Sequence, residues 1–123
     1  MWGGGGYLKV HSEVGDLIDW YNIQFYNRKS ANYCLTLRLL ILCALEGVTE
    51  YTTPKGLLTA SSSTWPNTAV FQIHASGVPL NKIVIGKPAT SGDAANGYMD
   101  TDTLATSLEQ AKKSKWSKYC NRP

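Results

Sequence analysis

The sequence predicts an α/β protein with a parallel sheet, because two apolar, β-rich runs alternate with two helical patterns along the chain. The two runs cover residues 16–27 and 82–86. A helical pattern follows the first run at residues 66–77, and another follows the second run after Asp100. Strands that alternate with helices in this order are typical of parallel sheets, where each helix returns the chain to the starting edge.

The first predicted strand, residues 16–27, is rich in aromatic and β-branched side chains, which favour a buried strand. Its apolar anchors are Ile18, Trp20, Ile23 and Phe25. The next apolar stretch, residues 33–45, fits a helix capped by Asn32, but its short length also fits a buried strand. Residues 50–64 are rich in Thr, Ser and Gly, so they are predicted to form a loop.

The second helix and strand have clearer boundaries. Pro66 suits the first turn of a helix, and Gly77 supplies its stop. The rough apolar face of this helix consists of Ala69, Val70, Ile73 and Ala75. Residues 82–86, KIVIG, are a short β-branched run between proline-containing turns, so they predict a buried strand.

The C-terminal part of the chain predicts a loop and then a helix. Residues 90–98 are rich in Gly, Asn and Asp. Asp100 or Asp102 then caps a helix, because both carboxylates can accept a hydrogen bond from its first turn. Leu104, Leu108 and Ala111 recur in this helix at i, i+4 and i+7, the spacing of one helical face.

Composition excludes several classes of function. The 123 residues form one domain at most, and 12 Lys+Arg against 9 Asp+Glu give a net charge of +3. That charge is too small and too scattered to predict nucleic-acid binding. The three cysteines lack paired spacing, and His11 and His74 have no partners at metal-ligand spacing, so no disulfide framework or metal site is predicted.

The sequence predicts neither a membrane span nor a signal peptide. The strongest apolar stretch, residues 35–45, is much shorter than the roughly 20 residues that cross a bilayer. Residues 1–6, MWGGGG, lack the apolar body that a secretory signal needs.

Three blocks of sequence carry specific motifs. They are DWYNIQFYN at 19–27, YTT at 51–53 with GLLTASSSTWP at 56–66, and VIGKPAT at 84–90 with GDAANGY at 92–98. In this order they resemble the sixth strand, the loop and helix start after it, and the seventh strand with its exit loop in glycoside hydrolase family 18 chitinases of the fungal, hevamine-like type. The resemblance covers residues 2–27 and 47–117.

This resemblance implies a partial (β/α)8 TIM barrel that holds only the sixth and seventh βα units, with site residues at the carboxyl ends of its strands. The implied family activity is hydrolysis of β-1,4-linked N-acetylglucosamine polymers by a substrate-assisted, retaining mechanism. In it, the substrate's own N-acetyl oxygen attacks the anomeric carbon. The implied partner is chitin or its oligosaccharides, with no cofactor, nucleic acid or membrane, and the parent family acts outside the cell.

Three residues match the family's substrate site. Tyr26 matches, by its place in Gln-Phe-Tyr-Asn, the tyrosine whose hydroxyl holds the N-acetyl group in the attacking position. Gln24 lies two residues earlier, on the same face of a strand, and would contact the sugar. Asn27 would lie at the rim. The resemblance therefore implies Tyr26 as a vestigial catalytic residue and all three as substrate-binding residues.

The family's acid signature, D-x-x-D-x-D-x-E at the end of the fourth strand, is missing from the 123 residues. Asp16 and Asp19 fit its first two positions, but Tyr21 and Ile23 occupy the next two, so this partial match is coincidental. We expect the first five strands and the eighth to be absent as well. The chain is therefore expected to be an inactive fragment, since protonation of the leaving group alone contributes roughly 10²–10⁴-fold.

Residues 28–46 and 118–123 depart from the family pattern. The expected organisation is a partial barrel domain over residues 1–117, interrupted by an aberrant insertion at 28–46, and a non-family tail at 118–123. The codons for Arg28-Lys29-Ser30 allow GTAAGT, the favoured start of a spliceosomal intron, and those after 116 allow it again. Our hypothesis is that both segments are translated introns.

Two other interpretations stay open. The chain is alternatively a non-catalytic chitin-binding, carbohydrate-binding or interaction module, with Trp20, Tyr26 and Trp65 as sugar platforms. It is also possible that the chain does not fold, because two parallel strands from a barrel leave two unpaired edges.

Overall fold

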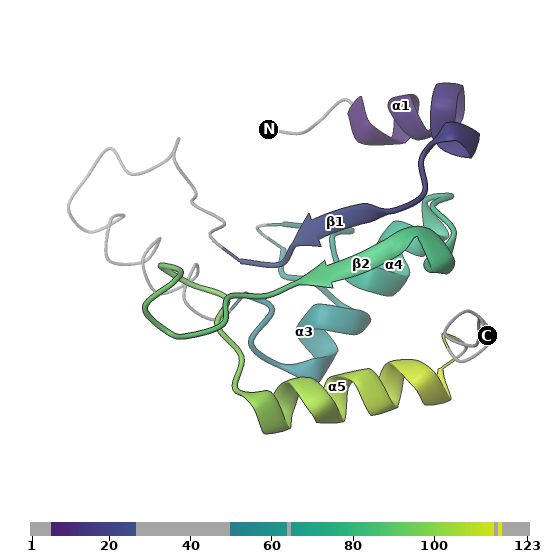
Figure 1. Cartoon of the computed structure of the whole chain (residues 1–123). Coiled ribbons are helices and arrows are strands. Elements are labelled where there is room, and N and C mark those ends of the chain that lie inside the picture. Colours follow the sequence, from purple (N-terminus) through teal and green to yellow (C-terminus); the bar gives the residue numbers. More distant parts are fainter. Residues whose placement is uncertain (1–5, 27–49, 64, 115, 117–123) are drawn as a thin grey trace.

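The computed structural model describes residues 6–26, 50–63, 65–114 and 116 (Figure 1). The predicted helix at 33–45, the insertion at 28–46 and the tail at 118–123 lie outside the described residues. The elements follow in the order α1 (Gly6–Val14), η1 (Gly15–Leu17), β1 (Tyr21–Gln24), α3 (Pro54–Leu58), α4 (Val70–Ala75), η2 (Leu80–Lys82), β2 (Ile83–Gly86) and α5 (Thr101–Lys113).

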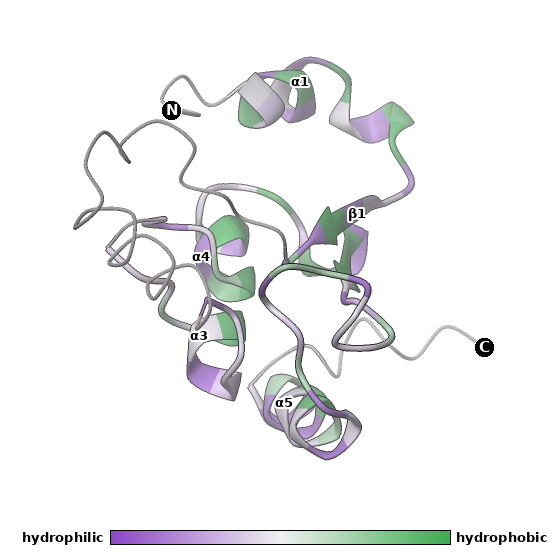
Figure 2. Ribbon diagram, turned by 90° about the vertical axis from the view of Figure 1, so that its left-hand side faces the viewer, coloured by the Kyte–Doolittle hydropathy of each residue, from purple (hydrophilic) through white to green (hydrophobic). Residues whose placement is uncertain are grey.

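The two predicted strands are confirmed, and they pair with each other. β1 and β2 run parallel, with Tyr21 opposite Ile83 and Gln24 opposite Gly86. β1 is shorter than the predicted range 16–27, because the chain forms a 3₁₀ turn at Gly15–Leu17 before it becomes extended. Figure 2 shows α3 and α4, which lie between the strands in sequence, on one side of the sheet. Two strands do not establish a barrel, so the (β/α)8 fold stays a prediction.

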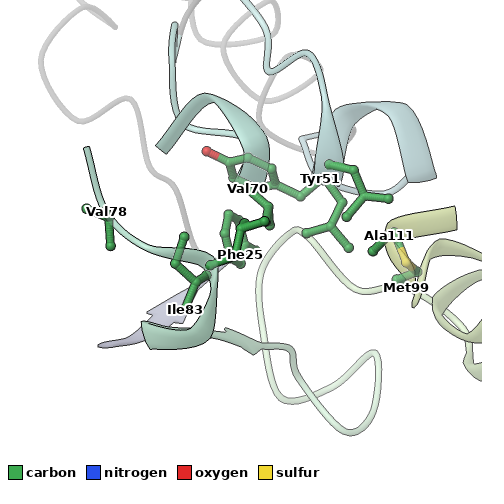
Figure 3. Close-up of a cluster of buried hydrophobic side chains, with 10 residues drawn as sticks. Phe25, Tyr51, Val70, Val78, Ile83, Met99 and Ala111 are labelled. Atoms are coloured by element: carbon green, nitrogen blue, oxygen red, sulfur yellow. The ribbon is translucent and has the colours of Figure 1, made fainter. Parts of the chain in front are cut away.

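The hydrophobic core lies between the sheet and the helices on that side (Figure 3). Its buried members are Phe25, Tyr51, Leu57, Leu58, Val70, Val78, Leu80, Ile83, Met99 and Ala111. The Phe25 and Tyr51 rings meet edge to face with their centroids 5.3 Å apart, a favourable arrangement for aromatic pairs. Because the two rings come from either side of residues 27–49, this contact joins β1 to the segment that leads into α3.

The prediction of a loop over residues 50–64 is wrong at α3. Thr53 caps this helix, since its hydroxyl accepts a hydrogen bond from the Gly56 N–H at 3.1 Å. Pro54 occupies the first helical position, where its missing N–H costs nothing. The abundance of Thr and Gly concealed a Thr-Pro helix start, and burial of Leu57 and Leu58 against the core stabilises the short helix.

The prediction that a helix begins at Pro66 is also wrong, because α4 begins four residues later. Asn67 has a positive φ of 62°, a left-handed conformation that no helix continues through. The Gln72 side chain accepts a hydrogen bond from the Ala69 N–H at 3.1 Å and so satisfies a free donor at the helix start. Gly77 ends the helix as predicted, with a φ of 114°.

α5 begins after Asp100, one of the two predicted caps. The Asp100 carboxylate accepts hydrogen bonds from the Thr103 N–H at 2.9 Å and from the Thr103 hydroxyl, and these bonds hold the pKa of Asp100 below its usual range. Ala111 is buried and Leu104 packs against the core. Leu108, which shares their helical spacing, is 47% exposed. Ser107 is fully buried in its place and donates to the Thr103 carbonyl at 2.7 Å.

The sequence did not predict α1, which has no buried residue. Its contact with the sheet includes His11, whose Nδ1 lies 2.9 Å from the Tyr21 hydroxyl. Near the start of β1, the Lys82 ammonium donates to the backbone carbonyls of Gly15 and Ile18 and so ties η1 and the residue after it to η2. Across the described ranges, no helix is both long enough and apolar enough to cross a membrane.

Candidate functional site

The candidate site lies at the edge of the sheet where both strands end. β1 ends at Gln24 and is followed by Phe25 and Tyr26, while β2 ends at Gly86 and is followed by Lys87. Because the strands are parallel and Gln24 lies opposite Gly86, Tyr26 and Lys87 leave the sheet at the same edge. In open and closed parallel sheets, ligand sites form at this carboxyl edge.

Lys87 holds this edge together through three backbone carbonyls. Its ammonium donates to Tyr51 O at 2.7 Å, to Gly97 O at 2.8 Å and to Phe25 O at 3.2 Å. The three acceptors belong to the end of β1, to the segment before α3 and to the loop after β2. Burial lowers the pKa of Lys87 to about 8. At neutral pH the side chain therefore keeps its charge and all three of its donors.

Gly97 fixes the backbone of Tyr26. It has a positive φ of 81°, and a Cβ added to it would lie 2.7 Å from the Tyr26 Cα and 2.9 Å from the Phe25 carbonyl oxygen. Only glycine permits both the backbone conformation and the close approach. The loop at residues 90–98, which the sequence predicted correctly, is thereby packed directly against the residue that follows β1.

The two faces of β1 differ in burial. Tyr21 and Ile23 are half-buried and Phe25 is fully buried, whereas Asn22 and Gln24 are exposed. Asn22 leans over β2, because its Oδ1 would lie 2.9 Å from a Cβ built on Gly86. The open face of the sheet therefore carries the exposed amide side chains of Asn22 and Gln24, and the Asn22 amide lies over Gly86.

The structure describes two of the three predicted substrate residues, Gln24 and Tyr26. Gln24 is exposed on the open face, and Tyr26 is half-buried in the bend that follows β1. The sequence placed both residues on one face of a strand, but β1 ends at Gln24, so Tyr26 lies beyond the strand. Asn27 lies outside the described residues. Gln24 and Tyr26 thus both lie at the carboxyl edge of the sheet, and their role in substrate binding stays a prediction.

The three aromatic residues of the alternative module do not form one platform. Trp20 precedes β1 and is 63% exposed, while Tyr26 follows the strand. Six residues of extended chain separate them by about 20 Å, at about 3.3 Å per residue. Trp65 is half-buried in the turn before α4, where its carbonyl accepts a hydrogen bond from the Thr68 hydroxyl.

Sequence reasoning missed two charged residues at this end of the molecule. Besides Lys87, it missed Glu50, which is only 4% exposed and accepts a hydrogen bond from the Ser62 N–H at 3.2 Å. Glu50 thus fastens the segment that enters α3 to the segment before α4. A charged residue within a polar stretch gives no signal of burial, because its partner is a backbone group that is distant in sequence. Throughout the described segments, no group of three or more His, Cys, Asp or Glu side chains is arranged to hold a metal ion.

Comparison with known proteins gives no match. No protein-family model fits the chain, and no curated protein or solved structure is significantly similar to it.

Proposed function

We propose that this chain derives from the sixth and seventh βα units of a family 18 chitinase barrel and that the 123-residue chain does not itself hydrolyse chitin. One observation carries the proposal: Gln24 and Tyr26, matched by the Gln-Phe-Tyr-Asn motif, lie at the carboxyl edge of a parallel strand pair. In the part of the chain that the structure describes, the helices between the strands, α3 and α4, lie on one face of the sheet, as the helices of barrel βα units do.

In the proposed parent enzyme, the Tyr26 hydroxyl orients the N-acetyl group of the sugar, Gln24 contacts the same sugar and Asn27 lies at the rim. The parent acts outside the cell on chitin or its oligosaccharides. The tight contact between Gly97 and Tyr26 supports this role, because a positioning hydroxyl needs a fixed backbone.

The proposed inactivity rests on the glutamates of the chain. Glu13, Glu46, Glu50 and Glu109 are its four glutamates, and none lies in a D-x-x-D-x-D-x-E context. Glu50 precedes Tyr51, whose carbonyl binds Lys87 at the carboxyl edge. It is buried and accepts a hydrogen bond from the Ser62 N–H. Protonation of a leaving sugar needs an acid that reaches the scissile bond.

A paired assay tests the proposal. The purified chain is incubated with a fluorogenic chitobioside and, separately, with insoluble chitin. We expect no turnover above the uncatalysed rate, together with chitin retention that Tyr26→Ala weakens. Tyr7→Ala is the matched control, because it removes an exposed tyrosine from α1 and leaves the carboxyl edge intact. Measurable turnover by the chain would overturn the proposed inactivity.

The alternative function, a non-catalytic chitin-binding or interaction module, is favoured by the high exposure of Trp20. An exposed indole is a suitable surface for stacking on a sugar ring. In this case Trp20→Ala abolishes retention on chitin, whereas Tyr26→Ala leaves it unchanged. The same assay therefore separates the two proposals: the first requires chitin binding at Tyr26, after the end of β1, and the second requires it at Trp20, before the start of β1.

The proposed translated introns are tested by the coding DNA. We expect codons for Arg28-Lys29-Ser30 and for Ser117-Lys118 that contain GTAAGT, and spliced transcripts that omit the codons for residues 28–46. CGC or AGA at codon 28 contradicts the first donor site.

A further inference from the structure

The hydrogen-bond ladder between β1 and β2 is interrupted just before Tyr26. One ladder bond runs from the Phe25 N–H to the Gly86 carbonyl at 3.1 Å. In a parallel ladder, the next bond would run from the N–H of residue 88 back to the Phe25 carbonyl. Residue 88 is proline, which has no N–H. The peptide that joins Phe25 to Tyr26 therefore cannot receive its ladder bond.

The Lys87 side chain supplies the donor that Pro88 lacks. Its ammonium donates to the Phe25 carbonyl at 3.2 Å and to the Gly97 carbonyl at 2.8 Å. Gly97 in turn lies so close to Tyr26 that an added Cβ would be 2.7 Å from the Tyr26 Cα. One ammonium thus holds both the peptide that precedes Tyr26 and the loop residue that packs on it.

This arrangement does more than replace one ladder bond. A residue with an N–H at position 88 would satisfy the Phe25 carbonyl without burying a charge. Burial of Lys87, in contrast, has a desolvation cost and lowers its pKa to about 8. The ammonium offsets this cost by binding Gly97 and Tyr51 as well, because its three donors match three carbonyls.

A second lysine binds backbone carbonyls at the opposite end of the sheet. Lys82 precedes β2, and its ammonium donates to the carbonyls of Gly15 and Ile18, which precede β1. It therefore joins segments at the amino ends of the strands, away from Gln24 and Tyr26. Lys82 provides a matched comparison for Lys87.

We propose that Lys87 is a positioning residue of the proposed sugar site: its ammonium holds the Phe25 and Gly97 carbonyls, so that Tyr26 keeps one backbone position from which its hydroxyl meets an N-acetylglucosamine oligosaccharide. The inference rests on the proposed function for the identity of the sugar. The hold of Lys87 on Tyr26 is measurable without any ligand. In this role Lys87 touches no sugar and acts through the backbone on either side of it.

The first experiment measures backbone order in the full chain by nitrogen relaxation. We expect order parameters of about 0.85 at Tyr26 and Gly97, the value of a rigid backbone, and values below about 0.6 there in Lys87→Cys. Lys82→Cys is the matched control, because it also removes an ammonium that binds carbonyls, and it should leave both residues rigid. Unchanged order at Tyr26 in Lys87→Cys overturns the proposal.

Chemical rescue separates the ammonium from the rest of the side chain. Lys87→Cys is treated with bromoethylamine in urea, where the introduced thiolate displaces bromide and gains an aminoethyl group. The product has the length of lysine and again ends in an ammonium. The unmodified chain, treated in the same way, is the reference, because it has three cysteines of its own. Once urea is removed, order at Tyr26 should return; if it does not return while the reference is ordered, the ammonium does not hold Tyr26.

The second experiment measures the dissociation constant for soluble chitotetraose by titration calorimetry. Lys87→Cys should raise it at least about fivefold, the equivalent of roughly one lost hydrogen bond, and aminoethylation should restore it to within about twofold. Lys82→Cys should leave it unchanged. An equal rise in both variants overturns the positioning role, because a general loss of structure would then explain both.

The two experiments distinguish failure of this inference from failure of the proposed function. An unmodified chain that binds no chitotetraose contradicts the proposed function, whereas the order parameters still decide whether Lys87 holds Tyr26. If circular dichroism shows that Lys87→Cys does not fold, the unmodified chain decides. Its Lys87 ammonium protons should exchange with water more slowly than those of the exposed Lys112, and equal exchange would overturn the proposal.

Discussion

The two sides of β1 differ sharply in how they are packed. On one side, Phe25, Tyr51, Leu57 and Val70 are 0–1% exposed between the sheet and the helices. On the outer side, α1 buries no residue and leaves Tyr7 66% exposed. The packed side contains the buried contacts that stabilise the fold, whereas the contact of α1 with β1 includes the half-buried pair of His11 and Tyr21.

The largest expected effect comes from the packed side. Phe25→Ala removes a fully buried ring that contacts Tyr51, and it should lower the free energy of unfolding by about 3–5 kcal/mol. Leu17→Ala, at a side chain that is 84% exposed, should change it by less than about 0.5 kcal/mol. Urea titrations of both variants measure this difference. Equal midpoints would contradict the conclusion that the buried Phe25 contributes more to stability than the exposed Leu17.

A smaller effect is expected at the carboxyl edge. Gly97→Ala forces a Cβ to within 2.7 Å of the Tyr26 Cα at a φ of 81°, and it should cost about 1–3 kcal/mol of stability. Gly92→Ala is the matched control in the same loop, because its nearest neighbour would lie 3.7 Å away. The same titrations measure both variants. A Gly97→Ala variant as stable as Gly92→Ala would show that the loop does not pack on Tyr26.

Lys87 predicts a pH dependence. Burial lowers its pKa from 10.5 to about 8, so between these two values the unfolded chain binds a proton that the folded chain has released. Stability then rises with pH over this window, because the unfolded state binds more protons. The rise is modest, since the side chain is partly exposed and solvent screens its charge.

The measurement is the difference in urea midpoint between the unmodified chain and Lys87→Met at pH 7 and at pH 10. Lys87→Met cannot titrate at this position and should lack the additional rise. A parallel change in both proteins would assign the pH dependence to other groups.

The smallest expected effect comes from the outer side. His11→Ala removes the contact between the imidazole and the Tyr21 hydroxyl, and it should cost about 1 kcal/mol, confined to α1. Hydrogen exchange should therefore speed up across α1 while Phe25 stays protected. His74→Ala, on α4, is the matched histidine control and should leave exchange in α1 unchanged. Faster exchange of Phe25 would show that α1 and the core unfold together.

Local signals in the sequence predicted some elements well. The β-branched run at β2 and the Asp100 cap of α5 are both confirmed, because a short apolar run and a capping carboxylate act within a few residues. The Thr53-Pro54 start of α3 was equally local, but the Thr- and Gly-rich composition around it concealed the signal. Leu108 shows the limit of helical periodicity, since the side chain at Ser107 faces the core instead.

The candidate site was predictable only in part. The Gln-Phe-Tyr-Asn motif indicated Gln24, Tyr26 and Asn27; the first two lie at one edge of the sheet, and Asn27 lies outside the described residues. Nothing local indicated that Lys87 would bind three carbonyls from three segments, or that Gly97 would approach Tyr26. Such contacts join residues 10 to 71 positions apart, as between Lys87 and Gly97 or between Tyr26 and Gly97, and a pattern of side chains does not encode them.

By itself, the sequence determined where β1, β2 and α5 form, because strand composition and helix capping depend on neighbours in the chain. The tertiary structure decided which face of β1 is buried and which lysine closes the carboxyl edge. Those outcomes depend on which distant segments compete for the same apolar and hydrogen-bonding surface, and that competition is settled only when the chain packs.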